Sequence, residues 1–446
     1  MIENDAFKLL LINLFHLNPD DIANILCTTF NKMMVLIVTL ADKHQACPYC
    51  GFTAPKIKEY VTKEITHSAL TTQKCIIKYR ARRYKCSCCG KTYYEFNPFV
   101  FKSQKISILT VHNILKDLKD FNETFTSVAR RYHVSPTSVS TIFDNHVDIG
   151  RNPLPEIINF DEVYAFKSEK SKYVCVLLDF KKQIPVDVLP NRKKEYLLNY
   201  FQKIPLEERK KVKYACSDMY EVYRDVVHKV FPSCCMLLDY FHLSQDFHRK
   251  MNEVRIKVMK GYKDNKASDE YYLLKKFNWL LFKNPEDEDK YGRLFDVERE
   301  RKYNSHFKSY MNYYDLRKKL LEINNDLTIC YSLKLELVDF YSKSTIDNAK
   351  VNLENLIRSC IDTNIDEMIA FSNNLINWKQ EIINSFTIVG TEYKVEADKG
   401  QVVVCNKKVN NAIIENRNKI IKCIKNNANG YTNWSRFRNR VMYVLD

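Results

Sequence analysis

The 446-residue sequence contains little glycine and proline, 8 and 12 residues, and no tandem repeat or low-complexity block. This scarcity excludes long flexible linkers. The most apolar stretch, residues 33–41, is too short to span a bilayer and predicts a buried strand. The first fifteen residues carry acids where a secretory signal carries basic residues, so we expect no export and no membrane partner.

Cysteine and positive charge are abundant instead. Fifteen cysteines in a chain that we expect to stay inside the cell indicate reduced thiols or metal ligands rather than disulfides. A formal net charge of +16 suits a polyanion such as nucleic acid better than a neutral metabolite, with anionic lipid as the competing partner. The length allows about two to four domains.

Two Cys-x-x-Cys-Gly motifs, CPYCG and CSCCG, predict a structural zinc site, because the glycine permits the tight turn that points two thiolates at one ion. Strand-like segments at 59–65 and 75–84 would bring the two motifs together. Cys88 is an alternative ligand, and two unrelated thiol pairs are the alternative interpretation. The expected zinc ligands are Cys47, Cys50, Cys86 and Cys89.

A basic and aromatic segment, residues 78–85, precedes the second cysteine motif. Such a segment suits contacts to DNA phosphates, although a solvated basic face would have the same composition. The side chains that we expect to contact phosphate are Arg80, Arg82, Arg83 and Lys85.

Residues 122–147 predict a helix-turn-helix. A short apolar face ends near His133, and Ser135 and Pro136 then supply the N-cap and first position of a second helix. The outward face of this second helix would read the DNA major groove, although such helix pairs also occur in cores that never touch DNA. The expected reading residues are Thr137, Ser138, Ser140 and Thr141.

Beyond Pro155, strands and helices alternate in the order β-β-β-α-β-α-β-α of ribonuclease H-like domains. In that arrangement the first strand lies beside the fourth, so Asp161 and Asp218 would meet at the surface of the sheet. Two carboxylates this close repel each other unless a divalent cation lies between them, which predicts Mg²⁺. The predicted strands are 157–165, 173–178, 184–189, 212–216 and 234–238, and the helices are 194–201, 220–230 and one that opens at 239–242.

The motifs CPYCG, CSCCG, NFDE, SDMYEVYRDVV, LLDYFH and ENRNKIIKCIKNNANGYTNWSRFRNR, taken in order with the helix-turn-helix, resemble bacterial insertion-sequence transposases of the ISL3 family. The resemblance runs from about residue 40 to the C-terminus. It implies a DDE enzyme of the bacterial cytoplasm, associated with the nucleoid, that binds two Mg²⁺ or Mn²⁺ ions per active site. Its partners would be double-stranded DNA, both terminal inverted repeats and target, on which the protein would act as a homodimer or higher oligomer.

Carried over by motif, the resemblance implies that Asp161, Asp218 and Glu415 are the catalytic, magnesium-binding acids. Asn416 stands where the family commonly has glycine, and the approach to Glu415 is longer than expected, so Glu392 and Glu396 remain alternatives. Asp239 and His242 match a D-x-x-H motif that would be an accessory part of the site. A helix-capping aspartate and a satisfied core histidine are the alternative interpretation for that pair.

The sequence therefore predicts a multidomain α/β protein with a zinc ribbon, a helix-turn-helix, and a ribonuclease H-like catalytic domain split by a helical insertion. Rival functions are a DNA-binding regulator that has lost catalysis and a metal-dependent nuclease without strand transfer. The predicted regions are an N-terminal segment 1–40, a zinc-binding domain 41–105, a helix-turn-helix 106–150, a first catalytic part 151–242, the insertion 243–400, and the closing catalytic helix with the C-terminus 401–446.

Overall fold

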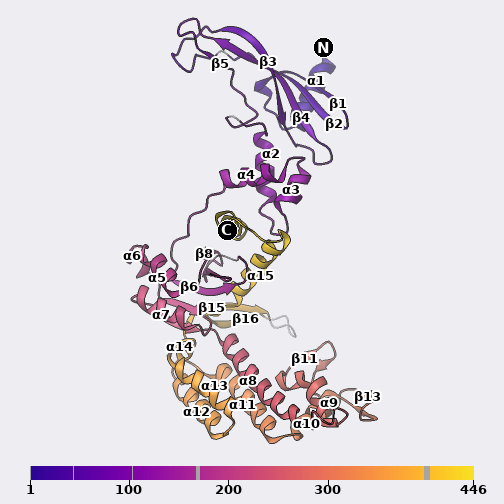
Figure 1. The fold of residues 1–446 in the computed structure, drawn as a ribbon, viewed down its shortest axis with the longest axis vertical. Helices are drawn as coiled ribbons and strands as arrows, with labels where there is room; N and C mark the ends of the chain where they lie inside the picture. The colour runs from indigo at the N-terminus through magenta and orange to yellow at the C-terminus, as the bar shows by residue number, and fades with distance from the viewer. Residues whose placement is uncertain (1, 44, 103, 167–170, 396–401) are drawn as a thin grey trace. The chain divides into compact units, whose positions relative to one another are not determined.

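The computed structural model describes residues 2–43, 45–102, 104–166, 171–395 and 402–446 (Figure 1). The chain forms two compact bodies. The first body contains residues 1–151, 164–167 and 419–446, and the second contains residues 152–163 and 168–418. Within the described residues, no helix combines the length and the apolar character needed to cross a membrane.

The first body begins with a five-stranded sheet of order β1-β2-β4-β3, with β5 paired to β4. Along β4 the side chains alternate, so Ile77, Tyr79 and Ala81 lie in the core while Arg80 is exposed. The core also receives Phe15 from the turn after α1. The elements are α1 (Ile2–Leu14), a 3-10 helix (Pro19–Asp21), β1 (Ile22–Phe30), β2 (Met33–Leu40), β3 (Lys56–Thr66), β4 (Cys75–Lys85) and β5 (Thr92–Tyr94).

Helices complete the first body: α2 (Ile108–Asp117), α3 (Phe125–Arg131), α4 (Pro136–His146) and α16 (Trp434–Leu445). The side chain of Ser135 accepts a hydrogen bond from the backbone N–H of Ser138, and Pro136 is the first residue of α4, as the sequence predicts. His133, in the turn between α3 and α4, has a φ of 53°. Apolar residues of α2, α3 and α4 share one buried cluster.

The second body contains a five-stranded mixed sheet of order β10-β9-β6-β7-β8. The three strands β10, β9 and β6 are parallel, and β7 and β8 continue the sheet in antiparallel pairing. This part contains β6 (Ile157–Val163), β7 (Val174–Asp179), β8 (Pro185–Leu189), α5 (Lys194–Gln202), α6 (Leu206–Arg209), β9 (Tyr214–Ser217), α7 (Glu221–Val230) and β10 (Cys235–Leu238).

The two faces of this sheet are covered differently. Ile158 and Phe160 point to the face that packs against α5 and α7. Ile157, on the opposite face, shares a cluster with Ile413 near the start of α15 (Ala412–Asn427). Because side chains alternate along a strand, Asn159 and Asp161 of β6 lie on the same face as Ile157, beneath α15.

A helical insertion separates β10 from α15, and its own apolar core extends from Leu243 to Phe386 (Figure 1). It ends in a β-hairpin, β15 with β16, that immediately precedes α15. The elements are α8 (Tyr240–Gly261), α9 (Asp269–Lys276), a 3-10 helix (Asn278–Phe282), β11 (Glu288–Asp289), β12 (Gly292–Arg293), β13 (Lys302–Asn304), β14 (Ser309–Met311), α10 (Tyr313–Glu322), α11 (Asn325–Lys343), α12 (Ala349–Asp362), α13 (Asp366–Asn377), α14 (Lys379–Asn384), β15 (Ile388–Val395) and β16 (Val402–Lys408).

The multidomain α/β architecture with mixed sheets agrees with the sequence prediction, but two expected boundaries fall inside compact units. The boundary at residue 40 lies within the first sheet, because β2 pairs in parallel with β4. The C-terminal region 401–446 is divided, because residues 419–446 belong to the first body. Residues of α16 pack against α2–α4, and sequence order alone cannot reveal such a contact between distant segments.

Candidate functional site

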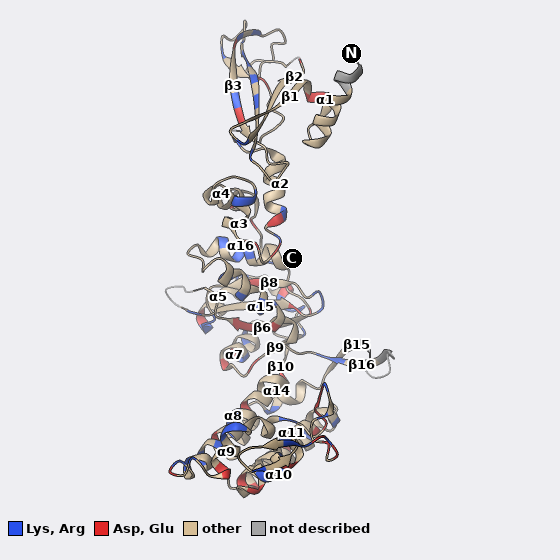
Figure 2. Ribbon diagram, turned by 90° about the vertical axis from the view of Figure 1, so that its right-hand side faces the viewer, with Lys and Arg blue, Asp and Glu red and all other residues tan. Residues whose placement is uncertain are grey.

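The parallel strands of the second body bring three aspartates to one level of the sheet. Asp161, Asp218 and Asp239 each follow, by four positions (161−157, 218−214, 239−235), a member of one row of paired residues, Ile157, Tyr214 and Cys235. Paired residues of neighbouring parallel strands lie side by side, so the three acids emerge at one edge of the sheet. Figure 2 marks the acidic residues of β6 in red.

Asp161 is a buried acidic residue of β6. Its side chain is only 8% exposed, and its Oδ2 accepts a hydrogen bond of 2.7 Å from Nδ2 of Asn418 on α15. Burial raises the pKa of the Asp161 carboxyl to about 7, and the charges of Asp218 and Glu415 act in the same direction. The Asp161 carboxyl therefore lies close enough to those of Asp218 and Glu415 to be repelled by each of them.

Asp218 and Asp239 each keep one oxygen without a partner. Oδ1 of Asp218 and Oδ2 of Asp239 are buried and accept no hydrogen bond within the described part of the chain. Burial raises the pKa of both carboxyl groups, and the charge of His242 opposes this rise only in part. Buried, unpaired carboxylate oxygens are costly unless a cation or a proton compensates them.

Glu415 and His242 complete this cluster. His242 Nε2 lies 3.8 Å from Glu415 Oε1 and 3.9 Å from Asp239 Oδ2, and it has no hydrogen-bond partner among the described residues. One potential ligand atom from each of these three residues lies within 4.8 Å of the other two. Asp239 and Glu415 offer carboxylate oxygens, the ligands that Mg²⁺ and Mn²⁺ prefer, and His242 adds an imidazole nitrogen, so the residues present fit a divalent cation.

Three asparagines hold the start of α15 against β6. Asn159 Nδ2 donates to Asn411 Oδ1 at 2.7 Å and to the backbone oxygen of Asn410 at 2.8 Å. Asn411 Nδ2 donates in return to the backbone oxygen of Phe160 at 3.3 Å. With Asn418 bonded to Asp161, these contacts set the position of Glu415, the fourth residue of the helix.

Sequence reasoning overlooked these asparagines, although a signal was present. Asn159 stands two positions before Asp161, on the same face of a strand, and Asn418 stands three positions after Glu415, on the same face of a helix. Arg192 was also overlooked. It pairs with Glu162, and its charge lowers the pKa of Asp218.

Glu396 lies outside the described residues. Glu392 lies on β15, where its backbone pairs with that of Cys405, and its side chain is not described.

The first body contains the cysteine cluster that the sequence predicts. The Sγ atoms of Cys47 and Cys89 lie 3.7 Å apart, and those of Cys50 and Cys86 lie 3.5 Å apart. A tetrahedral zinc ion with Zn–S bonds of about 2.3 Å requires S···S separations of about 3.8 Å, so the four thiols fit zinc. Cys88, the alternative ligand, is exposed and stands outside the cluster.

Backbone geometry supports both cysteine turns. Gly51 and Gly90 have φ values of 76° and 70°, a region that favours glycine. The backbone N–H of Cys89 donates to Cys86 Sγ, and this bond is the main cause that lowers the pKa of the Cys86 thiol to about 7. Metal binding requires the thiolate, so the turn favours the ligand form of Cys86.

The four basic residues expected to contact phosphate have different surroundings. Arg82 is held inside the sheet, where Nη1 pairs with buried Glu95 at 2.9 Å and the guanidinium also donates to two backbone oxygens. Arg83 pairs with Glu59 at 2.7 Å. Arg80 and Lys85 are exposed.

The α4 residues expected to read DNA also divide into two groups. Thr137 and Thr141 are exposed. Ser138 Oγ forms a hydrogen bond with Ser135 Oγ at 2.8 Å, and Ser140 Oγ donates to the backbone oxygen of Thr137 at 3.0 Å. Both serine hydroxyls therefore already form hydrogen bonds within α4 and its N-cap.

Two comparisons with known proteins bear on this site. A family model of transposases, the DDE type named after ISL3, matches residues 158–397, more than half of the chain. The match includes Asp161, Asp218, Asp239 and His242 and ends before Glu415. The chain is also similar to the transposase for insertion sequence element IS1001 of Bordetella parapertussis. Identity is 19% over 391 residues, which cover 87% of this chain and 86% of that protein.

Proposed function

Since the chain belongs to the ISL3 family of insertion-sequence transposases, we propose that it binds the terminal inverted repeats of its element and cuts and joins DNA at a divalent-metal site. One observation carries the proposal: acids from three parallel strands and from α15 converge at one end of the sheet, and two of them, Asp218 and Asp239, keep a buried oxygen without a partner among the described residues. Buried carboxyl groups without ionic partners usually cost stability, so their grouping here supports a role in binding cations.

We propose that the sheet of the second body is ribonuclease H-like. Numbered along the chain, its strands lie in the order 5-4-1-2-3, with the first strand beside the fourth. The helical insertion would then divide the catalytic domain between β10 and α15. This arrangement separates the proposed third acid, Glu415, from Asp218 by almost two hundred residues in sequence but not in space.

Asp161, Asp218 and Glu415 are the proposed catalytic residues and would hold Mg²⁺ or Mn²⁺. Two such ions, when bound, supply activation of a water or a 3′ hydroxyl and stabilisation of the leaving oxygen. Asn418 orients Asp161 by donating to Oδ2. The other oxygen, Oδ1, now accepts a hydrogen bond from the backbone N–H of Glu162 and would be the one available to the ion. Asp239 and His242 form, with Glu415, the group whose potential ligand atoms lie within 4.8 Å of one another, and they would act as accessory groups beside Asp161 and Asp218.

The first body would bind DNA. The cysteine cluster would hold one structural Zn²⁺ at the edge of the sheet, Arg80 and Lys85 would contact phosphates, and Thr137 and Thr141 would read bases from α4, the second helix of the proposed helix-turn-helix. Transposition joins two element ends to a target, so we expect a homodimer or higher oligomer on DNA.

The test is cleavage of a plasmid that carries the element's terminal repeats. Asp161→Ala, Asp218→Ala and Glu415→Gln should each abolish Mg²⁺- or Mn²⁺-dependent cleavage and strand transfer while end binding stays within about twofold. Asp187→Asn is the matched control, because Asp187 is a buried acid of the same sheet that bonds to Tyr200 rather than to the cluster. This control should keep activity.

Other outcomes would redirect the proposal. Cleavage retained in Asp161→Ala would refute the metal site. Retained cleavage in Glu415→Gln, with loss in Glu392→Gln or Glu396→Gln, would move the third ligand. If the unmodified protein binds the repeats but never cleaves them, the alternative function of a DNA-binding regulator without catalysis would be favoured. Cleavage without joining would favour a metal-dependent nuclease without strand transfer.

A further inference from the structure

The C-terminal helix α16 is the fourth helix of the bundle that contains α4. Tyr443 packs against the α2–α4 cluster, and its ring meets that of Phe143 edge to face with 5.8 Å between the ring centroids. Upstream of the helix, the ring of Tyr431 lies 6.4 Å from that of Phe125, the first residue of α3. The segment that follows α15 therefore contributes to the core of the bundle that we propose to bind DNA.

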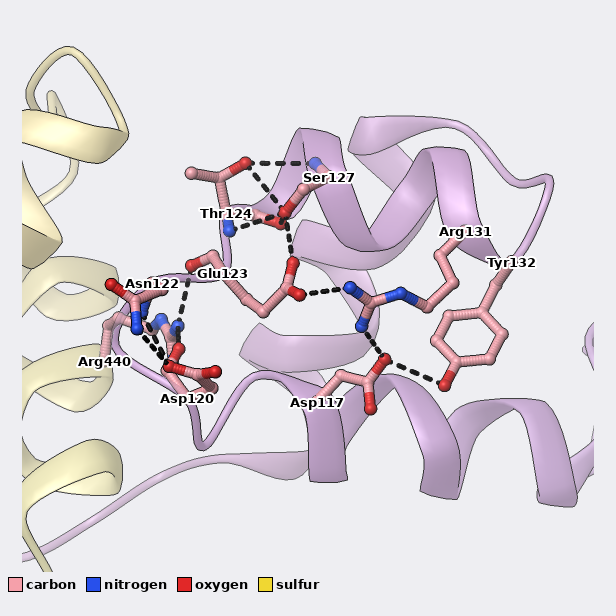
Figure 3. A network of polar contacts seen from close by, with 9 residues as sticks. All are labelled: Asp117, Asp120, Asn122, Glu123, Thr124, Ser127, Arg131, Tyr132 and Arg440. Atoms are coloured by element: carbon pink, nitrogen blue, oxygen red, sulfur yellow. Dashed lines mark hydrogen bonds and ion pairs between the residues drawn. The ribbon is translucent and has the colours of Figure 1, made fainter. Parts of the chain in front are cut away.

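Buried polar contacts place α16 against the start of α3. Arg440 is only 1% exposed, and its Nη2 donates to the backbone oxygens of Asp120 and Glu123, both at 2.9 Å (Figure 3). The carboxylate of Glu123 in turn accepts from Ser127 Oγ and pairs with Arg131 on α3. Loss of α16 would therefore release the turn that begins α3.

A second set of contacts holds the end of α4. Arg436 forms a two-pronged ion pair with Asp144, with Nη2 2.5 Å from Oδ2 and Nε 2.9 Å from Oδ1. Asn439 Nδ2 donates to the backbone oxygen of Val147 at 2.9 Å. The helix proposed to read bases is thus held at its C-terminal end by the C-terminal segment.

Between this segment and α3 lies a groove of about 430 Å³ that contains no acidic residue. A larger cavity of about 570 Å³ in the insertion is different, because its four basic residues face four acidic ones. We call the first one the C-terminal groove. It is lined by Thr124, Phe125, Thr126, Asn427, Ala428, Asn429, Gly430, Tyr431, Thr432, Asn433 and Arg436.

The C-terminal groove exposes unused hydrogen-bond donors. Thr126, Asn429 and Thr432 are exposed, and their side chains form no hydrogen bond within the described part of the chain. Hydroxyl and amide groups are common donors to phosphate and sugar oxygens of DNA, and among the described residues that line the groove none is a carboxylate that would repel a phosphate. The chemistry of the groove therefore suits the sugar-phosphate backbone of DNA better than a cation.

We propose that the C-terminal groove binds the sugar-phosphate backbone of the element's end while α4 lies in the adjacent major groove. The inference rests on the proposed end-binding function and extends it. It assigns part of the DNA contact to residues 427–436, which come from the far end of the chain. Because backbone contacts carry no sequence information, the groove contributes affinity and orientation rather than base preference.

Thr126→Asp tests the proposal in the full-length protein. Thr126 is the second residue of α3, where a carboxylate favours the helix, so the variant should remain folded while its charge repels phosphate. By fluorescence anisotropy, the affinities for the end duplex and for a scrambled duplex should both fall by about tenfold or more. Asn31→Asp, in the β1–β2 turn, adds the same charge outside the groove and should change neither affinity.

Thr432→Lys provides the opposite change. It should raise both affinities and steepen the dependence of log K on log salt concentration by about one, because one further phosphate is neutralised. Affinities within twofold of the unmodified protein in Thr126→Asp would overturn the inference, and so would a loss confined to the end duplex. An unmodified protein that does not prefer the end over the scrambled duplex would instead refute the proposed end recognition.

Discussion

The two candidate metal sites are built in opposite ways. In the first body, four thiols come from two short motifs whose glycines allow the turns, and the intervening hairpin of β3 and β4 joins them. In the second body, Asp161, Asp218, Asp239 and Glu415 come from separate strands and from a helix beyond a long insertion. A local motif reveals its ligands from spacing, whereas a site assembled by a sheet reveals them only through strand order.

The largest expected effect is loss of the local site. Cys47→Ser combined with Cys86→Ser should reduce bound zinc from about one per chain to none and unfold the sheet that carries the cysteines, because structural zinc sites contribute directly to folding. Metal analysis of reduced protein and thermal unfolding would measure both. Cys88→Ser should keep the zinc. Unchanged zinc in the double variant would exclude the cluster as its site.

The carboxylate site should destabilise the metal-free protein as pH rises. Asp161 has a pKa of about 7 in the folded chain, whereas an unfolded aspartate ionises near pH 4. The folded state therefore holds a proton that the unfolded state releases, and stability falls between about pH 4 and 7. Asp161→Asn removes this loss, which amounts to at most about 4 kcal/mol at pH 8.

Denaturant unfolding in the presence of a chelator would measure that difference. The variant should be more stable than the unmodified protein at pH 8 and equal to it at pH 4. Mn²⁺ should stabilise the unmodified protein much more than the variant. A variant that is less stable at pH 8 would contradict the assignment of Asp161 as a buried, uncompensated acid.

A smaller effect, on Mn²⁺ affinity, is expected from changing the residue of α15 that donates a hydrogen bond to Asp161. Asn418→Ala removes the donor to Asp161 Oδ2 and should weaken Mn²⁺ binding by about ten- to hundredfold, as changes to groups that orient metal ligands usually do. Calorimetric titration would measure it. Asn426→Ala, an exposed asparagine on the same helix, is the control. Equal Mn²⁺ affinity in both variants would show that Asn418 does not orient the ligand.

The smallest effect concerns DNA affinity beside the cysteine cluster. Arg80→Ala should leave stability unchanged and reduce the salt slope of DNA binding by about one. Arg82→Ala should instead destabilise the fold by about 3 kcal/mol, because the buried Glu95 carboxylate would lose its cationic partner. Salt titrations and unfolding curves of the two variants would separate these roles, and exchanged results would reverse the assignment.

Much of the fold was predictable because local patterns specify it. The cysteine motifs, the N-cap Ser135 with Pro136, and all five strands of the second sheet follow from spacing and periodicity. The role of a charged residue is harder to predict from its sequence neighbours when that role depends on burial. Arg82 and Arg83 look alike in sequence, yet only Arg82 pairs with a buried glutamate, since the register of β4 against β5 brings Glu95 to it.

Spacing and periodicity predict which elements form and which residues have the chemistry for metal and DNA, because these depend on neighbours a few positions apart. The packing of distant segments places Asp239 level with Asp161 and Asp218, anchors α15 beside them through asparagines, and returns α16 to the bundle of α4. The physical reason is common to all three. Burial and hydrogen bonding between distant segments depend on how strands and helices pack, and local periodicity does not predict that packing.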